Sequence, residues 1–239
     1  MTDSKAVLKS FLFTDLVGST ELKQRLGDAQ AAAIIDRHDK LFRQCLKRFG
    51  GSEEVNPGDE FFATFGLPSD AVRCALAFVK GLAELDVAES VKVRVGIHMG
   101  ETTQLETTES GRPKLVGLAV DTAARVMGVA QPRQILLTRH AFDSVRQHVG
   151  KGPDDSPVKW LAHGRYLFKG VEDPLEVFEA GVEGVSPLNP PPSSEKARRI
   201  LAPGDEETLG WRPAVGLTVP GRPGWTLERN LGAGGFGEV

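Results

Sequence analysis

Residues 10–17 read SFLFTDLV, and this stretch decides the fold that we expect for the chain. It is a short apolar run with one charge, Asp15, which is typical of a buried β-strand. An aspartate in an apolar strand is costly to bury unless it binds a cation or hydrogen-bond donors. The stretch therefore predicts an N-terminal strand that carries a polar site.

The end of this strand is suited to binding phosphate. A glycine and two hydroxyl side chains follow shortly after Asp15, and a helix is expected to start there. Backbone N–H groups at a helix start can cradle phosphate oxygens. The candidate substrate-binding residues of this segment are Leu16, Val17, Gly18, Ser19 and Thr20.

A second aspartate, Asp59, stands in a similar position. It follows an Asn-Pro-Gly turn at 56–58 and precedes the apolar run FFATF at 61–65. If this run lies beside the strand at 10–17, the two carboxylates meet and form a site that suits Mg²⁺. From the residues alone, the alternative is that both are ordinary turn aspartates.

The rest of the pattern alternates strands and helices. Further strands are expected at 60–65, 91–98 and 134–138, with a closing hairpin at 166–169 and 175–179. Helices are expected at 28–49, 71–85, 120–130 and 140–148, with a hairpin tip at 107–113. The order β-α-β-β-α-β, followed by further elements, predicts an α+β fold with helices packed on one antiparallel sheet.

Composition narrows the class of protein. The chain has 239 residues, 26% of them charged, and a formal net charge of −3, which gives no electrostatic footprint for nucleic acid or an anionic membrane. No apolar run approaches the roughly 18 residues of a membrane span, and residues 1–10 lack a signal peptide pattern, so we expect a cytoplasmic location. Cys45 and Cys74 are expected to be buried, reduced thiols.

Three regions are expected along the chain. Residues 1–181 form a globular domain, and residues 182–224 are a linker rich in proline and glycine, partly extended in the polyproline manner. Residues 225–239 have the pattern of a strand followed by a glycine turn. Within the expected linker, residues 196–199 (KARR) are a small basic cluster, either solvated or a docking contact for a following domain.

Six segments in order resemble the motifs of class III adenylate and guanylate cyclases. They are 13–20 (FTDLVGST), 58–65 (GDEFFATF), 93–101 (VRVGIHMGE), 117–125 (GLAVDTAAR), 134–138 (QILLT) and 168–170 (FKG). No single motif justifies the resemblance, but their common order does. The chain from 1 to 181 is identified as a member of this family, which implies a ferredoxin-like β-α-β-β-α-β core.

The resemblance implies a reaction and a set of roles. Two divalent cations, Mg²⁺ or Mn²⁺, are held by Asp15 and Asp59, and a nucleoside triphosphate is converted to a 3′,5′-cyclic nucleotide and pyrophosphate. Arg125 stabilises charge at the α-phosphate and Lys169 contacts the outer phosphates. ATP is favoured over GTP. The implied active form is a head-to-tail homodimer whose two subunits share each active site.

Three family positions differ in this chain. Asp121 stands where the family has the asparagine that orients the ribose, Val55 replaces a base-reading lysine, and Lys114 replaces its acidic or threonine partner. Val55 cannot hydrogen-bond a purine, and Lys114 offers donors where adenine needs an acceptor, although it suits guanine O6. Asp121 adds negative charge near a triphosphate and lies four residues before Arg125, so the two are expected to be able to pair.

These differences leave two interpretations open. In one, the metal ligands and Arg125 suffice for a working cyclase. In the other, the domain is a degenerate cyclase that dimerises or senses nucleotide in order to regulate another domain.

The last 15 residues, WTLERNLGAGGFGEV, indicate which other domain a degenerate cyclase would regulate. The pattern GxGxFGxV at 232–239 resembles the glycine-rich loop of a serine/threonine protein kinase. A bare GxGxxG also occurs in dinucleotide-binding folds, and a plain glycine-rich tail is the other alternative. We expect the chain to be the N-terminal part of a cyclase–kinase fusion, with the kinase domain covalently linked.

Overall fold

The structure is a computed structural model that describes residues 4–54, 60–85, 91–105, 114–150, 157–200, 215–218, 224–229, 233–234 and 237–238. Val55, Asp59 and the hairpin tip expected at 107–113 lie outside these residues. No helix among the described residues is long and apolar enough to cross a membrane.

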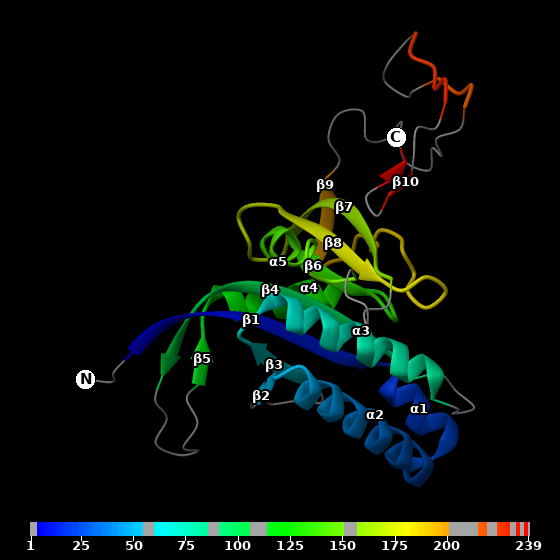
Figure 1. The fold of residues 1–239 in the computed structure, drawn as a ribbon. Helices are drawn as coiled ribbons and strands as arrows, with labels where there is room; N and C mark the ends of the chain where they lie inside the picture. Colours follow the sequence, from blue (N-terminus) through cyan, green and yellow to red (C-terminus); the bar gives the residue numbers. More distant parts are fainter. Residues whose placement is uncertain are drawn as a thin grey trace.

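Strands and helices follow one another through most of the described chain (Figure 1). The strands are β1 Ser4–Val17, β2 Ser52–Glu54, β3 Phe61–Phe65, β4 Lys92–Leu105, β5 Lys114–Val116, β6 Ile135–Thr138, β7 Lys159–Phe168, β8 Leu175–Gly181, β9 Ala197–Ile200, β10 Ala233–Gly234 and β11 Gly237–Glu238. The helices are α1 Ser19–Leu26, α2 Asp28–Arg48, α3 Pro68–Glu84, α4 Leu118–Val129 and α5 Arg139–Val145.

The first half of the chain forms the predicted ferredoxin-like core. Its elements run β1, α1 with α2, β2, β3, α3 and β4, and its strands lie in the order β2-β3-β1-β4 with every neighbour antiparallel. The sheet then continues through β6, β8, β7 and β9. The pair β4–β6 is parallel, with Val95 opposite Ile135, so the whole sheet is mostly rather than purely antiparallel.

The alternation of side chains along β1 places helices on both faces of the sheet. Leu12 and Leu16 join the main core cluster with residues of α2, α3 and α5. Phe11 and Phe13 point the other way and pack with residues of α4. Because β1 lies between β3 and β4 and is apolar on both faces, the run at 10–17 forms the centre of the core.

Helix α4 lies very close to β4 at Gly96. A Cβ atom built on Gly96 would lie 2.1 Å from the backbone nitrogen of Met127 and 2.6 Å from the carbonyl oxygen of Ala123. Real Cβ atoms do not approach backbone this closely, so only glycine fits between this strand and this helix. This contact sets the distance of α4 from the sheet.

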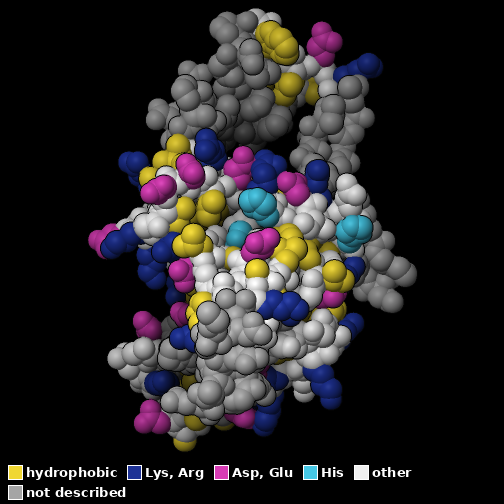
Figure 2. Space-filling model, turned by 90° about the vertical axis from the view of Figure 1, so that its left-hand side faces the viewer, with side chains coloured by type: hydrophobic (Ala, Val, Ile, Leu, Met, Phe, Trp, Pro, Cys, Tyr) yellow, Lys and Arg dark blue, Asp and Glu magenta, His cyan; other side chains and the backbone are white. Residues whose placement is uncertain are grey.

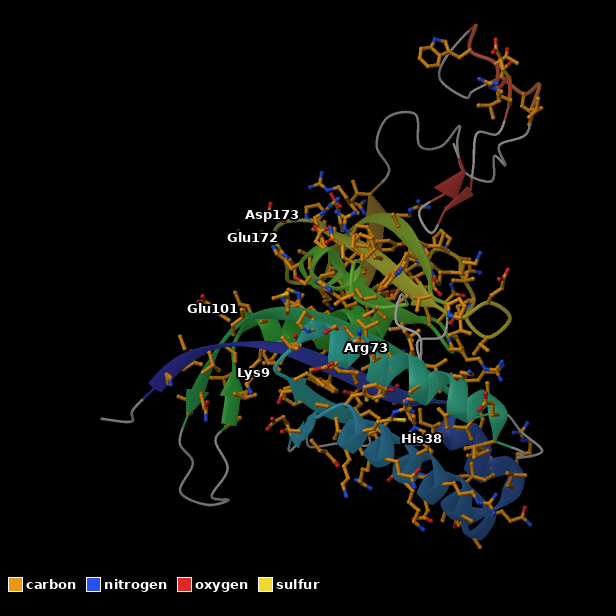
Figure 3. The ribbon with its side chains drawn as sticks, in the orientation of Figure 1. Lys9, His38, Arg73, Glu101, Glu172 and Asp173 are labelled. Atoms are coloured by element: carbon orange, nitrogen blue, oxygen red, sulfur yellow. The ribbon has the colours of Figure 1, made fainter. Side chains whose placement is uncertain are left out.

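Two histidines are packed into the fold. His98 on β4 is half-buried, and its Nδ1 atom lies 2.7 Å from the Thr138 hydroxyl. Burial, with a smaller contribution from His140, lowers the pKa of His98 to about 4. His38, labelled on α2 in Figure 3, contacts the rings of Phe61 and Phe78. Burial lowers its pKa too, although its hydrogen bond to Asp39 acts in the opposite direction.

Both cysteines are free and buried, as the sequence indicated. Cys45 lies on α2 and Cys74 on α3, within the main core cluster. Burial raises the pKa of each thiol, so neither favours the reactive thiolate.

The segment 182–200, which we call the strap, differs from the expected linker. It ends in β9, which pairs antiparallel with β7 so that Ala197 lies opposite Phe168 and Ile200 opposite Arg165. Ala197 is 3% exposed and packs in a cluster with residues of α4 and β7. The strap is therefore part of the folded domain, and the basic cluster at 196–199 lies on its outer strand.

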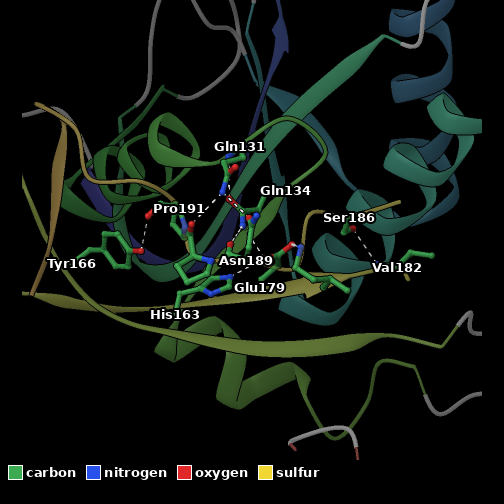
Figure 4. Close-up of polar contacts among 11 residues, drawn as sticks. Gln131, Gln134, His163, Tyr166, Glu179, Val182, Ser186, Asn189 and Pro191 are labelled. Carbon is green, nitrogen blue, oxygen red and sulfur yellow. Dashed lines mark hydrogen bonds and ion pairs between the residues drawn. The ribbon is translucent and has the colours of Figure 1, made fainter. Parts of the chain in front are cut away.

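Backbone groups of the strap are bound by buried side chains (Figure 4). The side chain of Gln134 donates to the Asn189 carbonyl at 2.8 Å, and the Tyr166 hydroxyl donates to the Pro191 carbonyl at 2.8 Å. The backbone N–H of Leu188 donates to the fully buried Glu179 carboxylate at 3.0 Å. Prolines have no N–H but keep an acceptor, so this proline-rich segment can still be held by donors of the domain.

The buried Glu179 carboxylate also has hydrogen-bond partners among the side chains of the domain. Glu179 Oε2 accepts from Gln134 Nε2 at 2.7 Å and lies 2.7 Å from His163 Nε2. A charge buried in this way is tolerated because several donors surround it. The hydrogen bonds of Glu179 therefore join β6, β7, β8 and the strap.

The surface of the described domain mixes charges of both signs. Figure 2 shows one face on which Lys and Arg side chains alternate with Asp and Glu side chains, with hydrophobic side chains between them. Over the coloured part of this face the basic side chains form no continuous stripe.

We expect Gly96→Ala to destabilise the domain by about 1–3 kcal/mol, because its methyl group would overlap the backbone of α4, which no rotamer change relieves. Gly66→Ala is the matched control, since a Cβ at Gly66 meets no atom within 4 Å, and its effect should stay within about 0.5 kcal/mol. Urea unfolding measures both. Equal stability of the two variants would contradict the close contact between β4 and α4.

We also expect the stability of the domain to fall as the pH falls from about 6.5, the ordinary pKa of histidine, to about 4, the pKa of His98 in the fold. In this range the unfolded chain binds a proton at His98 that the folded chain does not bind. The variant His98→Asn should show a shallower loss of stability, measured by urea unfolding at several pH values. His38 keeps its own contribution in both proteins, and an unchanged slope in His98→Asn would contradict the lowered pKa of His98.

Candidate active site

Asp15 lies near the end of β1 and is held by an arginine of the neighbouring strand. Asp15 and Arg94 are directly opposite in the pairing of β1 with β4. Arg94 Nε lies 2.9 Å and Nη2 2.5 Å from the same oxygen, Asp15 Oδ2. The two side chains are 13% and 28% exposed, so this ion pair is partly shielded from water. Both bonds use Oδ2, which leaves Oδ1 open to another ligand.

The segment after Asp15 turns directly into α1. Gly18 has a left-handed conformation, with φ 75°, and is the N-cap of this helix without any side-chain capping bond. Ser19 and Thr20 are therefore inside the first turn, and neither caps the helix. The side chain of Leu16 is 8% exposed and belongs to the core, while Val17 is exposed. The structure thus leaves backbone N–H groups at 18–20 beside the Asp15 end of β1.

Helix α4 carries the second group of candidate residues. Asp121 is in its first turn and exposed, and Arg125 is half-buried one turn later. Among the described residues these two side chains form no hydrogen bond or ion pair with each other. The pairing expected from their four-residue spacing is therefore wrong for this structure.

Arg125 lies against the turn that follows β7. A Cβ built on Gly170, which has φ 74°, would be 3.5 Å from Arg125 Nη2. This turn is closed by the N–H of Val171 donating to the carbonyl of Phe168 at 3.0 Å, and Lys169 is exposed within it. The fold thus places Arg125 against the turn that carries Lys169, which is more than forty residues away in the sequence.

The structure describes only one of the two positions expected to recognise the base. Lys114 is exposed at the start of β5, opposite Leu105 of β4. Val55 and the second expected metal ligand, Asp59, lie outside the described residues. The part of the chain that is described contains no cluster of three His, Cys, Asp or Glu side chains that could hold a metal.

The described residues of the expected metal site still fit a hard cation. Carboxylate oxygens are the ligands that Mg²⁺ prefers, and Asp15 presents Oδ1 without a hydrogen bond from any described residue. The Arg94 guanidinium at Oδ2 shows that this carboxylate already attracts a cation where it lies. A divalent ion at Asp15 would share the carboxylate with Arg94 or displace it.

Reasoning from sequence missed Arg94 as a site residue. Its motif was noted, but only the strand register places it opposite Asp15. A signal was present, because an aspartate in an apolar strand needs a cation or donor, and 91–98 was predicted to be a half-buried strand containing a basic residue.

Comparison with known proteins identifies the family to which the domain belongs. Residues 5–171 match the model of the adenylate and guanylate cyclase catalytic domain. An adenylate cyclase of Lachancea kluyveri is 30% identical over 150 residues, which cover 54% of this chain and 8% of that protein. An uncharacterized protein of Mycobacterium tuberculosis is 31% identical over 174 residues, covering 71% of this chain and 54% of that protein. The chain thus spans about half the length of the Mycobacterium tuberculosis protein and 8% of the Lachancea kluyveri protein.

A serine/threonine-protein kinase of Myxococcus xanthus is also similar, with 26% identity over 143 residues that cover 58% of this chain and 17% of the kinase.

Solved structures show the same fold. An adenylyl cyclase from P. aeruginosa superimposes with a TM-score of 0.66 at 16% identity, covering 76% of this chain and 97% of that one. A guanylate cyclase domain from Catenaria anguillulae, solved with GTP, gives a TM-score of 0.62 at 18% identity, covering 74% and 98%. Because the family model matches 167 of the 239 residues, the chain belongs to the adenylate and guanylate cyclase catalytic domain family.

Proposed function

We propose that this chain converts a nucleoside triphosphate to a 3′,5′-cyclic nucleotide and pyrophosphate in intracellular signalling. The observation that carries the proposal is the partly buried Asp15 carboxylate at the end of β1, beside the N–H groups that open α1. A buried carboxylate next to anion-binding backbone suits a substrate that arrives as a complex of phosphate and metal. Membership of the cyclase family adds to this support.

The basic residues of the chain would act on the phosphates. Arg125 would bind the α-phosphate and stabilise charge that develops there, and Lys169 beside it would bind the outer phosphates. Arg94 neutralises Asp15 in the free protein, and its guanidinium would become available to phosphate oxygens when another cation binds that carboxylate.

Asp15 and Asp59 would hold two divalent cations, Mg²⁺ or Mn²⁺. Such cations, when bound, would favour loss of the proton of the ribose 3′-hydroxyl and screen the charge of the phosphates. Asp15 contributes through a carboxylate whose direction is already fixed by its place in the sheet and by Arg94.

The proposed substrate is ATP rather than GTP. Curated relatives from several fungi are named adenylate cyclases, which supports this choice. Lys114 is the residue that would favour GTP, because its ammonium group can donate to guanine O6. Comparing the two nucleotides in one assay decides between them.

The proposed active form is a homodimer in which each site combines Asp15 of one subunit with Arg125 of the other. Leu118, at the start of α4 and three residues before Asp121, is 79% exposed. A large apolar side chain this exposed beside site residues is better covered by a partner than by water.

A second candidate function is supported by the same ion pair. If Arg94 holds Asp15 more tightly than a divalent ion does, the domain binds nucleotide without turning it over. It would then be a dimerising or nucleotide-sensing regulator of a kinase. Asp121 also supports this second function, because it is acidic where the resemblance implies an amide side chain.

We further propose that a serine/threonine kinase domain is covalently linked after this domain. The glycine-rich sequence at 232–239 supports this, and β10 and β11 pair as a short antiparallel hairpin within it. The similarity to a Myxococcus xanthus kinase is further support. A protein in the source cells that reacts with antibody to this domain and is much heavier than 25.8 kDa would be expected.

We expect the purified chain, residues 1–239, to form cyclic nucleotide from ATP with Mg²⁺ or Mn²⁺, detected by mass spectrometry. Asp15→Ala should lower the rate at least about 100-fold, as removal of a direct transition-state contact does. The matched control is Asp36→Ala, an exposed aspartate on α2 paired with Lys40, which should keep full activity. No product from a folded dimer that still binds nucleotide would favour the regulator instead.

We expect Asp121→Asn to raise kcat/KM, roughly threefold to tenfold, because it removes a negative charge from the vicinity of a triphosphate. Asp143→Asn on α5, an exposed aspartate paired with Arg139, is the control. A fall in kcat/KM on replacing Asp121 would instead mean that its carboxylate takes part in the reaction.

A further inference from the structure

The strap brings one more basic residue, Lys196, to the residues proposed to bind phosphate. The carbonyl oxygen of Lys196 accepts a hydrogen bond from the backbone N–H of Lys169 at 2.9 Å. Its own N–H donates to the Ser194 hydroxyl at 3.2 Å. The next residue, Ala197, is buried against α4 and β7. The backbone of Lys196 is therefore fixed on both sides, although the residue lies in a segment that reads as a linker.

The side chain of Lys196 extends across α4 at Gly128. Its Cδ lies 3.7 Å and its Nζ 4.0 Å from the position of a Cβ built on Gly128. Gly128 follows Arg125 by three residues, so the two positions are neighbours on one side of the helix. A glycine inside a helix is less favourable than an alanine, and here it leaves the helix surface open to the lysine.

Three basic residues thus lie on segments that contact one another. Arg125 comes from α4, Lys169 from the turn after β7, and Lys196 from the strap. Among the residues that the structure describes, none of the three forms an ion pair with a carboxylate. Like charges held close together by a rigid backbone raise the free energy of the empty site, and a multiply charged anion removes that cost.

Three carboxylates lie near this group in the chain. Glu172 and Asp173, both labelled in Figure 3, follow Lys169 in the same turn and are exposed. Glu195 precedes Lys196 and is exposed as well. In the described structure none of the three carboxylates forms an ion pair with Arg125, Lys169 or Lys196.

We propose that Lys196 is a third phosphate-binding side chain of this site, which with Lys169 binds the outer phosphates of the substrate and the pyrophosphate product. The inference rests on the proposed function for the identity of the substrate. The ligand chemistry follows from the cations themselves, because three donors of this kind suit adjacent phosphate groups better than a single carboxylate. The strap then supplies part of the active site.

The test measures binding of inorganic pyrophosphate to residues 1–239 by isothermal titration calorimetry, which requires no turnover. Lys196→Gln should weaken pyrophosphate binding roughly threefold to tenfold, as expected for loss of one partly exposed ionic contact. Lys196→Arg should restore most of the affinity. The matched control is Arg198→Gln, two residues further along the chain in β9, where the exposed side chain belongs to the residue opposite Leu167.

The same variants are then compared in the cyclase assay and in thermal unfolding. Lys196→Gln should raise KM for the nucleotide with less than about a twofold change in kcat, since it removes binding rather than chemistry. Arg198→Gln should change neither value. Unchanged melting temperatures show that the strap remains in place in both variants.

The outcomes separate this inference from the proposed function. If the chain makes no cyclic nucleotide but Lys196→Gln still weakens pyrophosphate binding, the proposed function fails and the phosphate site stands. The inference is overturned if wild-type protein does not bind pyrophosphate, if Lys196→Gln binds it as wild type does, or if Arg198→Gln weakens binding equally. The last result would mean that general positive charge, and not this position, attracts the anion.

Discussion

The backbone of α4 lies directly against the backbone of β4 at Gly96, and the rest of the site depends on this contact. Without a side chain at this point, the helix comes close enough for Ala119 and Ala123 to pack with Phe11 and Phe13 of β1. The same approach fixes the height of Arg125 above the sheet. A single small residue in a strand therefore determines where the basic side chains of the helix can lie.

The charges of the domain are arranged differently at its two groups of candidate residues. At the end of β1, the aspartate and Arg94 are opposite each other and balance within the chain. Around Gly170, basic side chains gather without a described acidic partner. The first group can accept a cation if that cation shares the Asp15 carboxylate with Arg94 or displaces Arg94, whereas at the second group the described basic side chains form no ion pair with a carboxylate. A substrate that carries both phosphates and a metal ion is complementary to the two groups together.

Much of this could be predicted from the sequence, and what was missed has a common physical cause. The runs of α2 and α3 have local periodicity and were predicted close to their observed positions, whereas β1 was predicted from residue 10 and begins at Ser4. Strand β2 has only three residues, and β9 lies in a proline-rich stretch, so each is a strand only because a distant partner pairs with it. Arg94 was overlooked for the same reason, since its role depends on register. The spacing of Asp121 and Arg125 suggested an ion pair. In the folded domain the Arg125 side chain lies against the turn at Gly170 instead.

The antiparallel pairing of β9 with β7 has a mechanical consequence. The chain leaves the sheet at Ile200, opposite Arg165, and the opposite end of the pair is Ala197 with Phe168. Force applied to the chain beyond Ile200 would break the hydrogen bonds between β9 and β7 one after another, starting at Ile200. It would not load all of them at once in shear. The link between Lys196 and the backbone of Lys169 would break last. Tension or thermal fraying can thus loosen most of β9 while the peptide group beside the phosphate-binding turn stays in place.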